Sequence, residues 1–295
     1  MAATTQPSRV VIYNAVPKTG SRGLEILLKL LGKAGGFRYE SARLGQYYPQ
    51  EEEMRLKIHN AANEDGAPFF YQNHARFFRN TSLAGSDQII WINIVREPLS
   101  RFRSWFYFHA QLLHDDLHVP PKDSGCVCPR DFDACVKVWM TRSCLRSLNG
   151  REIRSKSDWM ATALHEAPLP QWQHFCDWRP GCTVHDAIRN MQHGYAVVGL
   201  TDEFELTLAL LERKLPAFFR GAVRLYSKLS ASPENVARIR HSTSDHYHTN
   251  REISTTARNW LRTVEGFAEE QLFYEAAKRH FWLQSARQGN ATRDP

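Results

Sequence analysis

The sequence predicts an α/β fold in which an open, mostly parallel sheet lies between two layers of helices. One observation is that short β-branched runs alternate with segments whose apolar residues recur at helical spacing. A second is that the run at 89–95 is nearly continuously apolar, as is typical of a strand covered on both faces. Such sheets bind ligands beyond the carboxyl ends of their strands, so we expect function in the loops that follow the strands.

The first strand is expected at residues 9–14, where the chain is rich in β-branched residues. A helix should follow, because its leucines stand at i, i+3, i+4 and i+7 and form one apolar stripe. These leucines are Leu24, Leu27, Leu28 and Leu31. Gly35 and Gly36 indicate where this helix ends.

Later segments repeat the alternation of strand and helix. A short strand is expected at 68–71, and the strand at 89–95 should lead into a helix from Leu99 to about Leu113, with Pro98 in its first turn. A further strand at 195–200 precedes a helix at 204–211, and a last long helix is expected from about Thr255 to Leu283.

These elements are expected to form a single domain at 9–285. The region from about 114 to 194 breaks the alternation with Pro, Gly, Cys and Trp in irregular order, and is expected to be an irregular insertion. Residues 1–8 and 286–295 are expected to be flexible tails. No window approaches the roughly 18 apolar residues of a membrane span, and residues 1–8 lack the apolar core of a signal peptide.

Composition excludes several classes of protein. The chain has 295 residues, 42% of them hydrophobic and 23% charged, which argues against disorder, a collagen-like fibre or a small disulfide-stapled module. The net charge of +7 suggests a polyanionic partner, although simple solubility charge is the alternative. Lys and Arg are scattered, and no run resembles a nucleic-acid-binding tail, so we expect no nucleic acid partner.

The six cysteines do not have zinc-site spacing. Cys126 and Cys128 are too close for a C-x-x-C knuckle, and Cys176 and Cys182 enclose a segment rich in turn formers. Short-loop disulfides fit this pattern better, with buried free thiols as the alternative. The histidine groups at 109–118 and 241–248 also lack cysteine or carboxylate partners at diagnostic spacing, so no metal site is expected.

The first strand–helix loop has the features of a phosphate cradle. Lys18, Thr19, Gly20, Ser21 and Arg22 lie between a buried strand and a helix N-terminus, where backbone N–H groups can face an anion. The loop lacks the Walker pattern, since the Lys precedes its single glycine, and a plain turn is the alternative.

A second anion-binding element is expected at the end of the strand at 89–95. Arg96 leaves this strand at the edge of the sheet where Lys18 should lie, and Ser104 in the following helix can offer a hydroxyl to the same anion. Arg101 and Arg103 are expected to be no more than solvated helix charges.

These motifs carry a family resemblance. Residues 13–21 and 93–104 resemble the matching segments of the glycosaminoglycan 2-O-sulfotransferases, the family of the heparan sulfate and uronyl enzymes. Further matches lie at 70–74, 198–203 and 215–222. The resemblance implies a sulfotransferase-type fold whose P-loop-like loop binds a 5′-phosphosulfate.

The resemblance implies that 3′-phosphoadenosine 5′-phosphosulfate is the donor, without a metal. The 5′-phosphosulfate would lie on Lys18, Thr19, Gly20, Ser21 and Arg22, and the 3′-phosphate on Arg96 and Ser104. His74 would be the general base that takes a proton from the 2-hydroxyl of a uronic acid, and its unperturbed pKa of about 6.5 suits that role. Lys18 would stabilise charge that develops on the transferred group.

The acceptor implied by the resemblance is a glycosaminoglycan chain, either dermatan/chondroitin or heparan sulfate. Arg220, in a matched stretch, is a candidate acceptor-binding residue. The sequence departs from the family at Ala15, where these enzymes usually carry an Arg that helps to hold the acceptor, and at Arg22.

The resemblance also concerns cysteines, location and assembly. It implies disulfides between Cys135 and Cys144 and between Cys176 and Cys182. It implies the Golgi lumen, with a membrane anchor in a full-length form, and a homotrimer. The sequons at 80–82 and 290–292 suggest a glycoprotein.

Two other functions remain open. The chain could sulfate a different glycan or a protein, or it could be a non-catalytic glycan-binding relative. A pure binder would not need to keep both Lys18 and His74, and both are present. A nucleotide kinase is disfavoured, because the sequence has no Walker lysine and no acidic pair for magnesium.

Overall fold

A computed structural model describes residues 10–41, 51–63, 67–79, 89–115, 131–142, 169–177, 180–232 and 252–286. Almost all of the two expected tails lies outside these ranges, as do Cys126, Cys128, Cys144 and both sequons. In the described ranges, no helix has both the length and the apolar character that crossing a membrane requires.

The predicted α/β fold is confirmed, with a five-stranded sheet in the order β2-β3-β1-β4-β5. Every neighbouring pair is parallel. The strands are β1 (Val10–Asn14), β2 (Arg38–Ser41), β3 (Phe69–Asn73), β4 (Ile89–Val95) and β5 (Tyr195–Leu200). Val10 is in register with both Phe69 and Ile89, so β1, β3 and β4 begin and end at nearly the same level.

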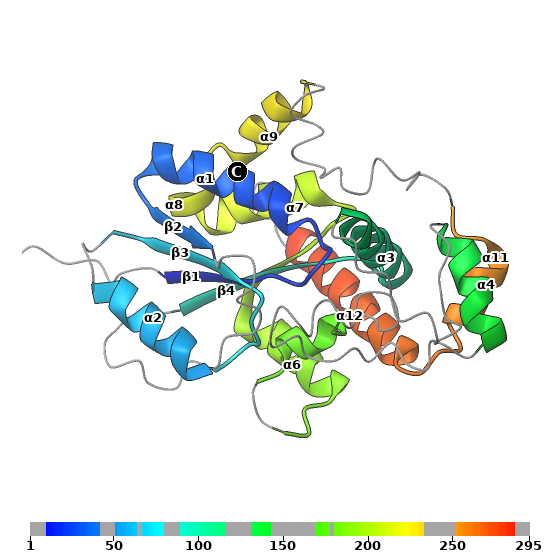
Figure 1. Ribbon diagram of the computed structural model, residues 1–295. Helices are drawn as coiled ribbons and strands as arrows, with labels where there is room; N and C mark the ends of the chain where they lie inside the picture. Colours follow the sequence, from blue (N-terminus) through cyan, green and yellow to red (C-terminus); the bar gives the residue numbers. More distant parts are fainter. Residues whose placement is uncertain are drawn as a thin grey trace, which may run out of the picture.

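Two helical layers cover the sheet (Figure 1). One contains α1 (Ser21–Gly35), α7 (Phe204–Lys214), α8 (Pro216–Phe219) and α9 (Ala222–Ser230). The other contains α2 (Glu51–Asn63) and α6 (Val184–Gly194), and α12 (Phe267–Ala286) packs against α6 and β5. The predicted leucine stripe of α1 is buried against the sheet, and Gly36, with φ 72°, ends this helix as expected.

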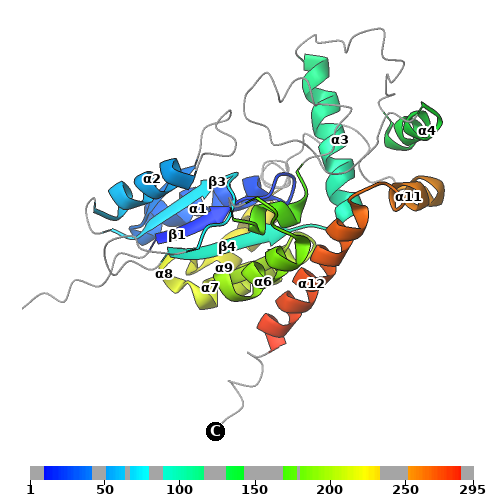
Figure 2. The same cartoon turned by 90° about the horizontal axis from the view of Figure 1, so that it is seen from below.

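A smaller hydrophobic cluster lies beyond the end of the sheet. It is formed by α3 (Pro98–Asp115), α4 (Phe132–Arg142), α11 (Thr255–Leu261) and the start of α12. Figure 2 shows α3 projecting away from the sheet, with α4 and α11 on the side of α3 that is farther from the sheet. In its aromatic centre the rings of Phe132 and Trp139 contact each other and both Phe102 and Phe106, and α3 joins this centre to the sheet.

Two sequence predictions need correction, and two elements were missed. The single helix expected from Thr255 to Leu283 is two helices, α11 and α12, because the chain turns at Gly266, whose φ of 84° suits glycine. The region at 114–194 is not irregular throughout, since it contains α4, the 3₁₀ helix η2 (Gln171–Phe175) and α6. Strand β2 and helix α2 were not predicted, because β2 has only four residues and α2 has little apolar periodicity.

Candidate active site

The candidate site lies at the carboxyl edge of the sheet, where four parallel strands end side by side. Strand β1 leads into the loop at 15–20, β3 leads directly to His74, β4 to Arg96 and β5 to Thr201. The expectation that Lys18 and Arg96 share one edge is therefore confirmed by the topology, and His74 lies at the same edge.

The loop after β1 has a constrained backbone. Lys18 has φ 70° and Gly20 has φ 89°, both in the left-handed region, which a lysine rarely adopts. Thr19 Oγ1 donates a hydrogen bond of 2.8 Å to the Val16 carbonyl, so this buried hydroxyl stabilises the turn. Within the described ranges, no side chain caps the N-terminus of α1, so the N–H groups of its first turn are suited to an anion.

Thr201 connects this loop to the neighbouring strands. Its Oγ1 donates to the Thr19 carbonyl at 2.8 Å, and its backbone N–H donates to the Val95 carbonyl at 2.9 Å. The loop after β1 and the ends of β4 and β5 are thereby joined through one residue.

Lys18 is the charged group at the centre of the loop. Its Nζ lies 3.9 Å from the centroid of the Phe108 ring on α3, which is cation–π geometry. Burial, together with the nearby positive charges of Arg96 and Arg22, lowers the pKa of Lys18 to about 7. A negatively charged ligand would stabilise the ammonium form of Lys18 and would therefore raise this pKa.

Arg96 approaches the same loop from β4. Its Nη1 donates to the Lys18 carbonyl at 3.3 Å. Among the described residues, its Nε is buried and has no hydrogen-bond partner. The guanidinium therefore retains a donor that an anion could satisfy, in agreement with a phosphate-binding role. Ser104 lies half-buried on α3, and Arg22 is exposed at the start of α1.

His74 is held in one tautomer. Its Nδ1 lies 2.6 Å from the carbonyl oxygen of Ala15, and because a carbonyl only accepts, Nδ1 must carry the proton. In the neutral ring, Nε2 then has the lone pair that a general base needs. Burial lowers the pKa of His74 and the charge of Arg101 lowers it further, while the bond to Ala15 raises it, so the neutral base dominates near pH 7.

A buried asparagine network lies directly beneath these residues, and the sequence did not reveal it. Asn93 Nδ2 donates to the side-chain oxygen of Asn14 at 2.9 Å. Asn14 Nδ2 in turn donates to the Tyr195 hydroxyl at 2.8 Å and to the His174 carbonyl at 2.9 Å. These bonds join β1, β4 and η2 to Tyr195, the first residue of β5, close to where the loop after β1 begins.

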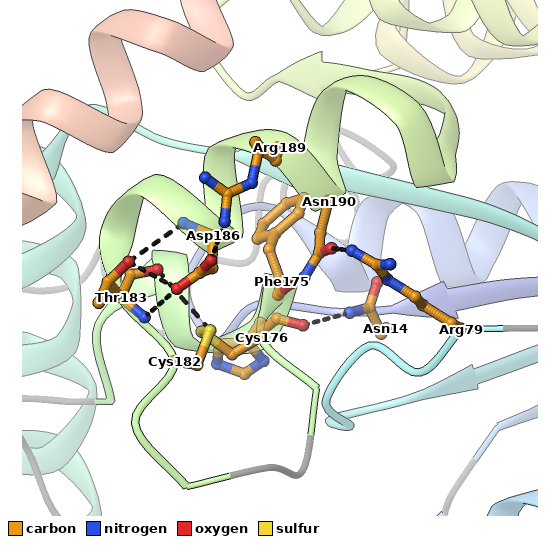
Figure 3. The surroundings of a disulfide bond; sticks show 10 residues. Asn14, Arg79, Phe175, Cys176, Cys182, Thr183, Asp186, Arg189 and Asn190 are labelled. Carbon is orange, nitrogen blue, oxygen red and sulfur yellow. Dashed lines mark hydrogen bonds and ion pairs between the residues drawn. A yellow bond between two sulfur atoms is a disulfide. The ribbon is translucent and has the colours of Figure 1, made fainter.

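The disulfide between Cys176 and Cys182 is confirmed. It closes the segment between η2 and α6 (Figure 3), close to Asn190, whose Nδ2 donates to the Phe175 carbonyl at 2.9 Å. Cys135 is also disulfide-bonded, but its expected partner Cys144 lies outside the described residues, so that pairing stays a prediction.

Arg220 does not lie beside Lys18, His74 and Arg96. It is exposed and lies two residues after Phe218, whose ring centroid is 5.1 Å from that of Phe37. Phe37 follows the C-terminal end of α1, whereas Lys18 precedes its N-terminal end, and a helix of 15 residues is about 22 Å long. The predicted role of Arg220 in acceptor binding stays a prediction.

Arg101 was predicted to be a solvated helix charge, and this is wrong. Its side chain is only 3% exposed and pairs with Glu270 of α12 at 2.9 Å. Apolar periodicity gave no sign of this, because the partner is 169 residues away in the sequence. In the described part of the chain, no His, Cys, Asp and Glu side chains gather in a group that could hold a metal ion.

Comparisons with known proteins show which proteins the chain resembles. The Sulfotransferase family matches residues 1–275. The chain is 28% identical over 240 residues to uronyl 2-sulfotransferase of Mus musculus, which covers 75% of this chain and 51% of the relative. It is 26% identical over 227 residues to heparan sulfate 2-O-sulfotransferase 1 of Xenopus laevis, covering 74% and 58%. It is 26% identical over 297 residues to uronyl 2-sulfotransferase homolog pip of Drosophila melanogaster, which covers 94% of this chain and 53% of the relative.

The chain thus spans little more than half the length of these relatives.

Proposed function

Because the chain belongs to the sulfotransferase family, we propose that it transfers a sulfuryl group from 3′-phosphoadenosine 5′-phosphosulfate to the 2-hydroxyl of a uronic acid in a glycosaminoglycan. The names of the relatives, which are uronyl and heparan sulfate 2-O-sulfotransferases, support the acceptor class. The observation that carries the proposal is that His74, with its proton fixed on Nδ1, and the loops that contain Lys18 and Arg96 meet at one edge of the sheet.

The donor would use both loops. The 5′-phosphosulfate lies on the loop from Lys18 to Arg22, where the N-terminus of α1, which no described side chain caps, and the Lys18 ammonium bind negative charge. The 3′-phosphate lies on Arg96, whose buried Nε lacks a partner among the described residues, and on Ser104. Thr19 and Gly20 contribute mainly by shaping the loop, since the Thr19 hydroxyl is already bonded to Val16.

His74 would act as the general base. Its Nε2 accepts the proton of the 2-hydroxyl as that oxygen attacks sulfur. The new oxygen–sulfur bond forms while the bond between sulfur and the 5′-phosphate oxygen breaks, which releases adenosine 3′,5′-bisphosphate. Lys18 stabilises the charge that develops on the bridging oxygen and the sulfuryl group. The Ala15 carbonyl keeps the proton of His74 on Nδ1 throughout.

The remaining expectations belong to the same proposal. The partner is a glycosaminoglycan chain and not a nucleic acid, and Arg220 stays a predicted acceptor contact. The protein acts in the Golgi lumen as a glycoprotein, with a membrane anchor in a full-length form, and can assemble as a trimer. The disulfide between Cys176 and Cys182 supports an oxidising compartment.

The test is transfer of radiolabelled sulfate from the donor to a panel of desulfated heparan, chondroitin and dermatan chains. We expect the wild-type protein to label at least one chain and His74→Ala to lose about 100-fold or more of the rate, as for removal of a general base. His193→Ala is the matched control, because His193 is an exposed histidine on α6. It should retain the wild-type rate.

Two outcomes would contradict the proposal. Labelling of a protein or another glycan, but of no glycosaminoglycan, would support sulfuryl transfer and reject the glycosaminoglycan as acceptor. Tight binding of adenosine 3′,5′-bisphosphate without transfer to any acceptor would indicate a non-catalytic relative.

A further inference from the structure

A buried polar network behind the candidate site connects both anion-binding loops to the C-terminal helix. Arg101, on α3, donates hydrogen bonds to groups at different points of the fold. Its Nε donates to the Pro17 carbonyl at 3.0 Å, in the loop that carries Lys18. Its Nη2 donates to the Leu169 carbonyl at 2.7 Å, and its Nη1 donates to Glu270 at 2.9 Å.

Glu270 continues the network to η2. One carboxylate oxygen accepts from Arg101, and the other accepts from the backbone N–H of Gln171 at 2.8 Å. Both acidic oxygens are thus used, and Glu270 is only 5% exposed. The start of η2 is fixed in position by a charged side chain of α12.

Gln171 completes the network on Arg96. Its Oε1 accepts from the Arg96 backbone N–H at 2.8 Å, and its Nε2 donates to the Arg96 carbonyl at 2.8 Å. The side chain of Gln171 therefore satisfies both backbone polar groups of Arg96, in the way a neighbouring strand would. Arg96 lies one residue past the end of β4, where the strand no longer supplies these partners.

The network fixes the positions of groups more than it adds to the stability of the fold. A buried ion pair contributes little net stability, because desolvation of both charges opposes their attraction. It does fix directions, since each bond requires its partner at a set place. Here the fixed places are the Pro17 carbonyl of one loop and the backbone of Arg96 in the other.

We infer that Gln171, oriented by Glu270 and Arg101, is a positioning residue that holds the backbone of Arg96 so that its guanidinium meets the donor's phosphate. This inference rests on the proposed function, since it assigns Arg96 to the donor. It predicts that loss of the Gln171 amide weakens donor binding and leaves acceptor binding and the chemical step largely unchanged.

The test compares Gln171→Met with Gln173→Met. Methionine has nearly the shape of glutamine but lacks the amide, and Gln173 lies half-buried on the same short helix with no side-chain bond to Arg96. Calorimetry measures binding of adenosine 3′,5′-bisphosphate to each folded protein. Steady-state kinetics give KM for donor and acceptor separately, and hydrogen–deuterium exchange follows the peptide that contains Arg96.

We expect Gln171→Met to weaken nucleotide binding at least about tenfold and to raise the donor KM by a similar factor, because two buried backbone groups lose their partners. The acceptor KM and kcat should change less than about twofold, and exchange at Arg96 should accelerate. Gln173→Met should match the wild type within about twofold in every measurement.

A folded Gln171→Met protein that binds the nucleotide as well as wild type would overturn the inference, as would equal losses for donor and acceptor. If Gln171→Met does not fold, Glu270→Gln is measured by the same criterion, with Glu269→Gln on the exposed side of α12 as its control. Failure of the wild-type protein itself to bind the nucleotide would instead reject the proposed function.

Discussion

The low pKa of Lys18 makes donor binding depend on pH in a way that ordinary lysines do not. Burial and the charges of Arg96 and Arg22 lower this pKa from 10.5 to about 7 in the free protein. An anionic donor selects the ammonium form. Above pH 7 the protein must therefore take up a proton when it binds, and binding weakens as pH rises.

The size of the effect follows from the pKa. If only charged Lys18 binds, the apparent Kd is proportional to 1 plus the ratio of neutral to charged lysine. With a pKa of about 7, this factor is about 2 at pH 7 and about 100 at pH 9, so Kd should rise about 50-fold. A lysine with an unperturbed pKa would give almost no change over this range. Phosphate groups of the ligand are already ionised above pH 7.

The assay is calorimetric titration with adenosine 3′,5′-bisphosphate at several values of pH from 7 to 9. Lys18→Arg is the comparison, because a guanidinium stays charged throughout, and its Kd should change less than about twofold. A wild-type Kd that stays constant between pH 7 and 9, or an equal pH dependence in Lys18→Arg, would refute this account of Lys18.

The same pKa has an opposite consequence for the protein without ligand. Between pH 7 and 10.5 the unfolded chain holds a proton on Lys18 that the folded chain does not, so this residue makes the free energy of unfolding rise with pH. In Lys18→Met, the free energy of unfolding should therefore rise less between pH 7 and pH 9 than in the wild type, as measured by urea unfolding. An equal rise in both proteins would contradict the low pKa of Lys18.

Three further predictions concern stability and the acceptor. Replacing Cys176 and Cys182 by Ser opens a loop with a sequence separation of 6 and should lower the free energy of unfolding in urea by about 2 kcal/mol; no change would show that the bridge constrains little. Gly199→Ala should lower it by about 2 kcal/mol or more, since the added Cβ would lie 2.1 Å from Thr207 Cγ2, and a loss below about 0.5 kcal/mol would mean that Thr207 moves aside freely. Arg220→Ala should leave nucleotide affinity within about twofold of wild type by calorimetry, because Arg220 lies far from the donor loops, and a larger loss would contradict that placement.

The sequence predicted the elements with strong local signals. The leucine stripe identified α1, and continuous apolar runs identified β1, β4 and β5. Their parallel arrangement then placed Lys18 and Arg96 at one edge without further information. The break between α11 and α12 was missed, because apolar residues continue across it at helical spacing and only Gly266 marks the turn.

The rest of the site depends on contacts between distant segments. Gln171 bonds to Arg96, 75 residues away, and Asn93 bonds to Asn14, 79 residues away. No local pattern distinguishes these side chains from solvated ones. Arg101 shows this most clearly, since on a helix of mixed composition its spacing gave no sign that it is buried against Glu270.

The central claim is that His74 removes the proton from a uronic acid 2-hydroxyl during sulfuryl transfer. The most direct measurement is to sulfate the preferred chain with wild type and with His74→Ala, digest it with lyases and quantify the disaccharides. The account predicts 2-O-sulfated uronic acid as the new product of the wild-type protein and its loss by about 100-fold or more in the variant. Sulfate on another position, or full 2-O-sulfation by His74→Ala, would contradict it.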